Sequence, residues 1–128
     1  GGLLGNGVRF GMAGPVMVAA EGIETTLSIR QVLPELPMIA CLSAAHLAAV
    51  QFPPMLRRLY VGRDNDTAGE NAVATLHQRV AGTGIEIIAL EPCRDDFNTD
   101  LCADGAEQLA MALRAQLVGE DAAAFLRP

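Results

Sequence analysis

The sequence predicts an α/β domain in which a mainly parallel sheet of about four strands is covered by helices on both faces. Three observations favour this fold class. Short apolar runs alternate with longer segments whose apolar residues recur at helical spacing. The apolar runs are continuous, which is typical of parallel strands buried on both faces. The chain has 128 residues, enough for one substantial core and too few for two.

The alternation of strand and helix repeats four times. The predicted strands are Pro15–Ala20, Pro37–Leu42, Arg57–Gly62 and Ile85–Leu90. The predicted helices are Glu24–Leu33, Ala44–Gln51, Thr67–Ala81 and Gly105–Val118, and the tail could form a short terminal helix. A polar loop, residues 91–100, joins the fourth strand to the last long helix.

Residues at the element boundaries support this assignment. Pro34 ends the first helix because proline cannot continue the backbone hydrogen-bond pattern. Ser43 is a favoured N-cap residue for the second helix. Gly82 and Gly84 follow the third helix, where glycine commonly ends a helix.

We expect one domain, residues 15–118, preceded by a Gly-rich segment, residues 1–14, and followed by a tail, residues 119–128. The Gly-rich segment looks as if it was cut from a longer protein. No apolar run approaches the roughly 18 residues of a membrane helix, so no membrane partner is expected. The three cysteines form no C-x-x-C pair, which argues against a disulfide framework and a zinc ribbon and favours the cytoplasm.

The basic residues exclude several chemistries. All nine are arginine, so the chain has no P-loop lysine, Schiff-base lysine or lysine nucleophile. The formal net charge is −6, which disfavours unaided binding to a polyanion. If nucleic acid is the substrate, metal ions or basic regions outside this chain must offset the acidic surface.

Carboxylates follow three of the four predicted strands. They are Glu21 after the first strand, Asp64 and Asp66 after the third, and Asp95, Asp96 and Asp100 after the fourth. The carboxyl ends of parallel strands share one edge of the sheet, where ligands bind. Two carboxylates about 4 Å apart repel by about 4 kcal/mol at an effective dielectric constant near 20, so either a proton or a cation should be held there. Oxygen ligands favour Mg²⁺, with Mn²⁺ as a substitute.

An isolated D-x-D motif is more often a solvated turn or a helix cap than a site. The hypothesis of a metal site therefore depends on the three strand ends together. Glu24 and Asp66 have a simpler interpretation as first-turn residues that complement a helix dipole.

Two motifs resemble those of the Toprim domain family, which primases, topoisomerases and some nucleases share. Glu21-Gly22 follows the run "VMVAA", and Asp64-Asn65-Asp66-Thr67-Ala68-Gly69 follows "RRLYVG". The longer strings "VAAEGIETTLSI", "LPMIACLSAAHLAAV" and "CRDDFNTDL" look most like the Toprim domains of plasmid- and phage-associated primases and primase-helicases. The resemblance covers roughly residues 16–101 and implies a compact Rossmann-like fold.

The resemblance implies a role for each acidic residue. Glu21 would be the general acid or base, and Asp64 and Asp66 would hold Mg²⁺. Asp96 would be the third acid and could bind a second ion, with Asp95 as its close rival.

Four further residues would support this site. They are Gly22, Glu24, Arg63 and Gly69. Gly69 would let the backbone turn tightly into the helix, and Arg63 should pair with an acid rather than with a phosphate. The bacterial replicative primases place a second acid four residues after the glutamate, where this chain has Thr25.

The function implied is Mg²⁺-dependent nucleotidyl transfer in RNA primer synthesis, with single-stranded DNA and nucleoside triphosphates as partners. Other domains would help to hold them, since the chain has neither a zinc-binding module nor a P-loop. A Toprim-type nuclease and a non-catalytic interaction module remain as alternatives. A haloacid dehalogenase-type phosphatase is disfavoured by Ala68 and by the absence of lysine, and a topoisomerase by the predicted burial of Tyr60, the only tyrosine.

Overall fold

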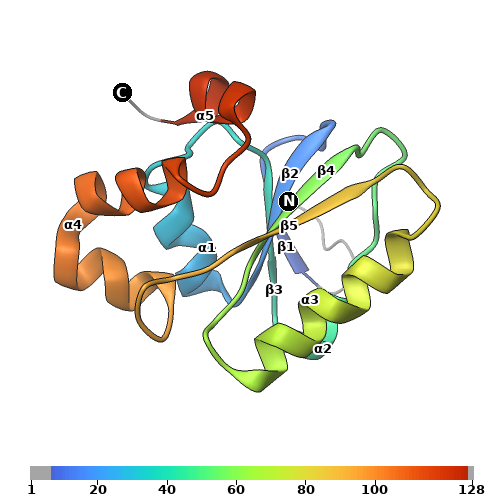
Figure 1. Ribbon diagram of the computed structural model, residues 1–128, viewed down its shortest axis with the longest axis horizontal. Helices are drawn as coiled ribbons and strands as arrows, with labels where there is room; N and C mark the ends of the chain where they lie inside the picture. The colour runs from blue at the N-terminus through green and yellow to red at the C-terminus, as the bar shows by residue number, and fades with distance from the viewer. Residues whose placement is uncertain (1–6, 127–128) are drawn as a thin grey trace.

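The computed structural model describes residues 7–126, and its centre is a five-stranded sheet with helices on both faces (Figure 1). The strands are β1 (Gly7–Phe10), β2 (Val16–Glu21), β3 (Met38–Cys41), β4 (Arg58–Gly62) and β5 (Glu86–Leu90), in the spatial order β1-β3-β2-β4-β5. Strands β2 to β5 pair in parallel, and β1 is antiparallel to β3. The predicted α/β class is therefore confirmed.

The sheet has one strand more than the sequence predicted. Strand β1 comes from the Gly-rich segment that we placed before the domain, and it pairs with the outer edge of β3 from Gly7 opposite Cys41 to Phe10 opposite Met38. A Cβ atom on Gly7 would lie 2.7 Å from Cγ1 of Ile39, so the glycine itself permits this close pairing. The earlier part of that segment, residues 1–6, lies outside the described residues.

Five helices complete the fold within residues 7–126. They are α1 (Ile23–Arg30), α2 (Ala44–Ala48), α3 (Thr67–Val80), α4 (Phe97–Arg114) and α5 (Gly119–Phe125). Helix α4 begins earlier than predicted because the carboxylate of Asp96 accepts a hydrogen bond from the Thr99 N–H and caps it. It is interrupted at Gly105, where the sequence placed its start and where the backbone is not helical.

Two hydrophobic cores lie on opposite faces of the sheet. Along β2, Val16, Val18 and Ala20 pack into the core beneath α1, α4 and α5. Met17 and Ala19 face the core beneath α2 and α3. Figure 1 shows these two helical layers on either side of the sheet. β2 is therefore buried on both faces, as its continuous apolar sequence predicts. No described helix combines the length and hydrophobicity needed to span a bilayer.

Helix α5, from the predicted tail, is fastened to the sheet by a buried polar network. The carboxylate of Asp121 accepts hydrogen bonds from Tyr60 Oη at 2.5 Å and from Arg58 Nη1 at 2.8 Å. The Tyr60 oxygen in turn accepts one from the Val118 N–H at 3.0 Å. Tyr60 is fully buried, in agreement with its predicted place inside a strand. Burial and the Asp121 carboxylate raise the pKa of Tyr60 to about 12.

Replacing Asp121 by alanine should lower the free energy of unfolding by about 2–3 kcal/mol, because it leaves the guanidinium of Arg58 short of its buried partner. Urea denaturation measures this change. Glu120→Ala is the matched control: its carboxylate is exposed and 3.7 Å from Arg58 Nη1, so the loss should stay below about 0.5 kcal/mol. Equal losses in the two variants would contradict the role given to Asp121.

Candidate metal centre

The register of the parallel strands brings the acidic residues to one place. Ala20 lies opposite Gly62 on β4, and Gly62 lies opposite Leu90 on β5. The three strands therefore end level with one another, and the residues that follow them emerge at the same edge. In the sheet, β2 lies between β3 and β4. After β2 the chain continues to β3 on one side of it, and after β3 it crosses to β4 on the other side. The loops that follow β2 and β4 therefore diverge at this edge of the sheet.

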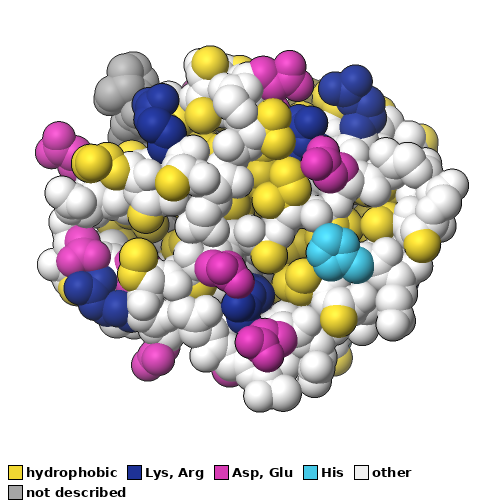
Figure 2. All heavy atoms as spheres, in the orientation of Figure 1, with side chains coloured by type: hydrophobic (Ala, Val, Ile, Leu, Met, Phe, Trp, Pro, Cys, Tyr) yellow, Lys and Arg dark blue, Asp and Glu magenta, His cyan; other side chains and the backbone are white. Residues whose placement is uncertain are grey.

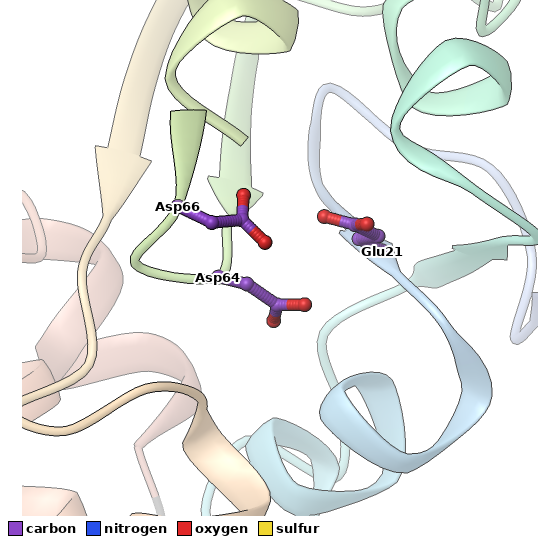
Figure 3. A group of neighbouring side chains, drawn as sticks. All are labelled: Glu21, Asp64 and Asp66. Carbon is purple, nitrogen blue, oxygen red and sulfur yellow. The ribbon is translucent and has the colours of Figure 1, made fainter. Parts of the chain in front are cut away.

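Three carboxylates gather at this point. Glu21 from the end of β2, Asp64 from the β4–α3 loop and Asp66 at the start of α3 each offer an oxygen, and these oxygens lie within 4.8 Å of one another. Figure 3 shows the three side chains directed into a common space between the two strand ends. Glu21 and Asp64 are half-buried, whereas Asp66 is exposed.

The carboxylates destabilise one another's charged forms. Burial, then the charges of Asp64 and Asp66, raise the pKa of Glu21 above its usual value. Burial, then the charges of Asp66 and Asp96, raise the pKa of Asp64, and a hydrogen bond from Thr25 partly opposes this. The centre therefore favours a proton or a cation.

The β4–α3 loop is shaped by Asp66 and Gly69. Asp66 is the N-cap of α3, and its Oδ1 accepts a hydrogen bond from the Gly69 N–H at 2.7 Å. A Cβ atom on Gly69 would lie 2.6 Å from the carbonyl oxygen of Asp64 and 3.1 Å from Oδ1 of Asp66. Because Gly69 has no side chain, the first turn of α3 can lie directly against Asp64 and Asp66.

Gly22 supports the other side of the centre. Its φ angle of 82° lies in the left-handed region that glycine adopts at least cost, and it directs the chain from β2 into α1 immediately after Glu21. Its N–H donates to the carbonyl of Cys41 at 2.6 Å. The position of Glu21 is therefore tied to the ends of both β2 and β3.

None of the three candidates for a further acid belongs to the group of three carboxylates, and Asp96 is the one whose charge contributes to the raised pKa of Asp64. Its negative charge is felt by Asp64, although it also caps α4. Asp100 is buried, and its oxygens accept hydrogen bonds from the N–H groups of Cys93 and Arg94, so it holds the loop together. The Asp95 side chain is exposed, and its carbonyl accepts a hydrogen bond from the Asn65 N–H.

The other supporting residues lie at the margin. Arg63 forms an ion pair with Glu91 at 2.7 Å, which agrees with its expected pairing with an acid. Glu24 is exposed in the first turn of α1, where its charge complements the helix dipole.

Sequence analysis missed the contributions of two polar residues. Thr25, which is 5 % exposed, directs its hydroxyl at Asp64 Oδ1 at 3.4 Å. Asn65 donates from Nδ2 to the carbonyls of Pro92 and Arg94. A polar residue between two aspartates is a weak signal, because its partners lie about 30 residues away in sequence.

The donor set fits Mg²⁺. All three groups are carboxylates, the hard oxygen ligands that this ion prefers. Oε2 of Glu21 is buried and has no hydrogen-bond partner among the described residues, so the protein leaves a lone pair free at the centre. Asp64 and Asp66 would hold the ion from the loop after β4, with Glu21 facing them.

Comparison with known proteins identifies the family. The model of the Toprim domain matches residues 16–107, well over half of the chain. The chain belongs to the Toprim domain family. A search of curated protein sequences finds no match.

Two solved structures share this Toprim fold. One is the Aquifex aeolicus primase, comprising its zinc-binding and RNA polymerase domains, with a TM-score of 0.57 and 15% identity over 80% of this chain and 26% of that one. The other is the primase fragment of the bacteriophage T7 primase-helicase protein, with a TM-score of 0.54 and 18% identity over 77% of this chain and 42% of that one. The chain thus spans less than half the length of either structure.

Replacing Gly69 by alanine should weaken Mn²⁺ binding at least about ten-fold and cost about 1–3 kcal/mol of stability, because the new methyl group displaces the loop that carries Asp64 and Asp66. Calorimetric titration and urea denaturation measure the two effects. Gly119→Ala is the control, since a Cβ atom there would meet no heavy atom within 4 Å beyond its chain neighbours and its own helix backbone. Unchanged Mn²⁺ affinity in Gly69→Ala would show that the close approach is unimportant.

Replacing Asp64 by asparagine should raise the melting temperature of the metal-free Toprim domain by about 4 °C at neutral pH, because it removes a charge that is disfavoured by burial and by the neighbouring carboxylates. A carboxyl group whose pKa is raised by folding contributes stability below its unfolded pKa and loses that contribution as the pH rises through the folded value. The gap between variant and wild type should therefore be small near pH 4 and widen towards neutrality.

Thermal unfolding in the presence of a chelator, at several pH values, checks this expectation. Asp95→Asn, which removes an exposed charge outside the cluster, should leave the melting temperature within about 1 °C. A destabilised Asp64→Asn protein at neutral pH would refute the predicted cost of the Asp64 charge.

Proposed function

We propose that this Toprim domain catalyses Mg²⁺-dependent nucleotidyl transfer as part of a DNA primase-like protein that makes RNA primers in plasmid or phage replication. The convergence of Glu21, Asp64 and Asp66 at the ends of β2 and β4 carries the proposal. The likeness of the fold to two primase structures supports it.

The residues divide the chemistry between them. Asp64 and Asp66 hold Mg²⁺, which when bound neutralises charge that develops on phosphate oxygens. Glu21 acts as the general base that accepts a proton from an attacking 3′-hydroxyl. The raised pKa of Glu21 makes its carboxylate a stronger base, which favours proton transfer from the hydroxyl near neutral pH. Asp96, whose charge acts on Asp64, would help to hold a second ion.

The substrates are a single-stranded DNA template and nucleoside triphosphates, held with the help of other domains. Figure 2 shows acidic and basic side chains interspersed over one face, rather than a continuous basic surface there. With a net charge of −6, the chain attracts nucleic acid weakly on its own. Basic surfaces outside this chain would supply the remaining affinity.

The same carboxylates would also serve phosphodiester hydrolysis, so a Toprim-type nuclease is the competing function. A non-catalytic module is the third, and the retention of Glu21, Asp64 and Asp66 together argues against it. The three differ in their products, which makes them separable by assay.

Replacing Glu21 by glutamine should reduce primer synthesis at least about 100-fold, because the amide cannot accept the proton. The assay follows incorporation of labelled ribonucleotides on single-stranded DNA with Mg²⁺, with Mn²⁺ or with a chelator. Glu35→Gln, which changes an exposed glutamate outside the cluster, is the matched control and should retain full activity.

Glu21-dependent nicking of the template without primer synthesis would establish the nuclease instead. Absence of both activities, together with a melting temperature that Mn²⁺ does not raise, would establish the non-catalytic module. Primer synthesis that persists in Glu21→Gln would overturn the role given to this residue.

A further inference from the structure

Asn65, the middle residue of the D-N-D sequence, joins two loops that are distant in sequence. Its Nδ2 atom donates both hydrogens to the β5–α4 loop, to the carbonyl of Pro92 at 2.9 Å and to that of Arg94 at 2.5 Å. Its backbone N–H donates to the carbonyl of Asp95 at 2.8 Å. Three hydrogen bonds from one residue thus end on the loop that leads directly into Asp96.

The β5–α4 loop is also held from its other side. Asp100 accepts hydrogen bonds from the N–H groups of Cys93 and Arg94 at 2.7 and 3.0 Å. The guanidinium of Arg94 contacts Asp100 at 3.3 Å and pairs with Asp104 through two bonds of 2.6 and 3.0 Å. These bonds fix the loop to the first half of α4. Among the described residues, two sets of bonds join it to the loop of Asp64: the ion pair of Arg63 with Glu91, at the first residue of the loop, and the Asn65 bonds, which hold the part of the loop next to Asp96.

This connection opposes a repulsion. Asp64 and Asp96 carry like charges, and the charge of Asp96 helps to raise the pKa of Asp64 across the gap between the two loops. Without the Asn65 bonds, the Arg63–Glu91 pair would hold only the start of the β5–α4 loop, and outward movement of residues 92–96 would relieve that repulsion and carry Asp96 away. A neutral amide with two N–H donors ties the loops together without adding a further negative charge.

We propose that Asn65 is a positioning residue that holds Asp96 within reach of the metal ions of this centre. The inference rests on the proposed function, since it assumes that the carboxylates bind divalent ions. It goes beyond that function by assigning a task to the residue between the two aspartates. Its partners are backbone carbonyls, so the task depends on the amide of Asn65 and not on the side chains of the opposite loop.

The test measures whether Asn65 and Asp96 act as one unit in Mn²⁺ binding. The variant Asn65→Leu keeps nearly the same shape and removes both side-chain donors. Together with Asp96→Asn and the double variant it forms a double-mutant cycle on the 128-residue chain, read by calorimetric titration with Mn²⁺. Asn71→Leu, the same change at an exposed asparagine of α3, is the matched control.

We expect Asp96→Asn and Asn65→Leu each to weaken Mn²⁺ binding by about ten-fold, the scale on which groups that orient metal ligands act. The double variant should bind Mn²⁺ no more weakly than Asp96→Asn alone, because Asn65 has no carboxylate left to position once Asp96 is replaced. Asn71→Leu should match the wild type. If Asn65 only stabilised the fold, its replacement would lower the melting temperature, and its effect on Mn²⁺ affinity would simply add to that of Asp96→Asn.

Three results would overturn the inference while leaving the proposed function intact. They are wild-type Mn²⁺ affinity in Asn65→Leu, wild-type affinity in Asp96→Asn, and losses that multiply in the double variant. A wild-type chain that binds no Mn²⁺ would instead overturn the proposed function itself, and the inference with it. The two failures are therefore distinguishable in one set of titrations.

Discussion

The register of β2 against β4 is the constraint on which the rest of this Toprim domain depends. Because Ala20 lies opposite Gly62, the two strands end level, and Glu21 meets Asp64 and Asp66 across a few ångströms. A slip of one residue would turn every side chain of β2 to the other face of the sheet. The two cores prevent such a slip, since Val18 packs on one side and Met17 on the other.

The same register places three carboxylates close together, and the described residues provide no positive charge or hydrogen bond that fully offsets their repulsion. Oε2 of Glu21 has no hydrogen-bond partner among the described residues, and the pKa values of Glu21 and Asp64 are raised. The two buried aspartates of the described residues have hydrogen-bond partners within the fold: Asp121 accepts from Tyr60 and Arg58, and Asp100 from two backbone N–H groups. The half-buried Glu21, with an oxygen that lacks a partner, therefore differs physically from the buried aspartates, whose carboxylates hold the structure together.

Sequence reasoning predicted the parts of this fold that depend on local patterns. The four parallel strands follow from continuous apolar runs, and the start of α2 follows from Ser43, which accepts the His46 N–H. It missed β1, because a four-residue strand in a Gly-rich segment has no apolar run of its own and is held by pairing with β3. It also placed the start of α4 too late, because the cap at Asp96 was taken for part of a polar loop.

The amino-acid sequence by itself determined the family, the order of the four parallel strands and the helices between them, and the identity of the acids at the strand ends. These follow from residue type and spacing along the chain. Only the tertiary structure separated Asp96, whose charge acts on Asp64, from Asp100, whose oxygens are used by the loop. It also revealed the bonds from Thr25 and Asn65. The reason is physical: the role of a polar side chain is set by the atoms around it, and here those atoms come from segments far away in the sequence.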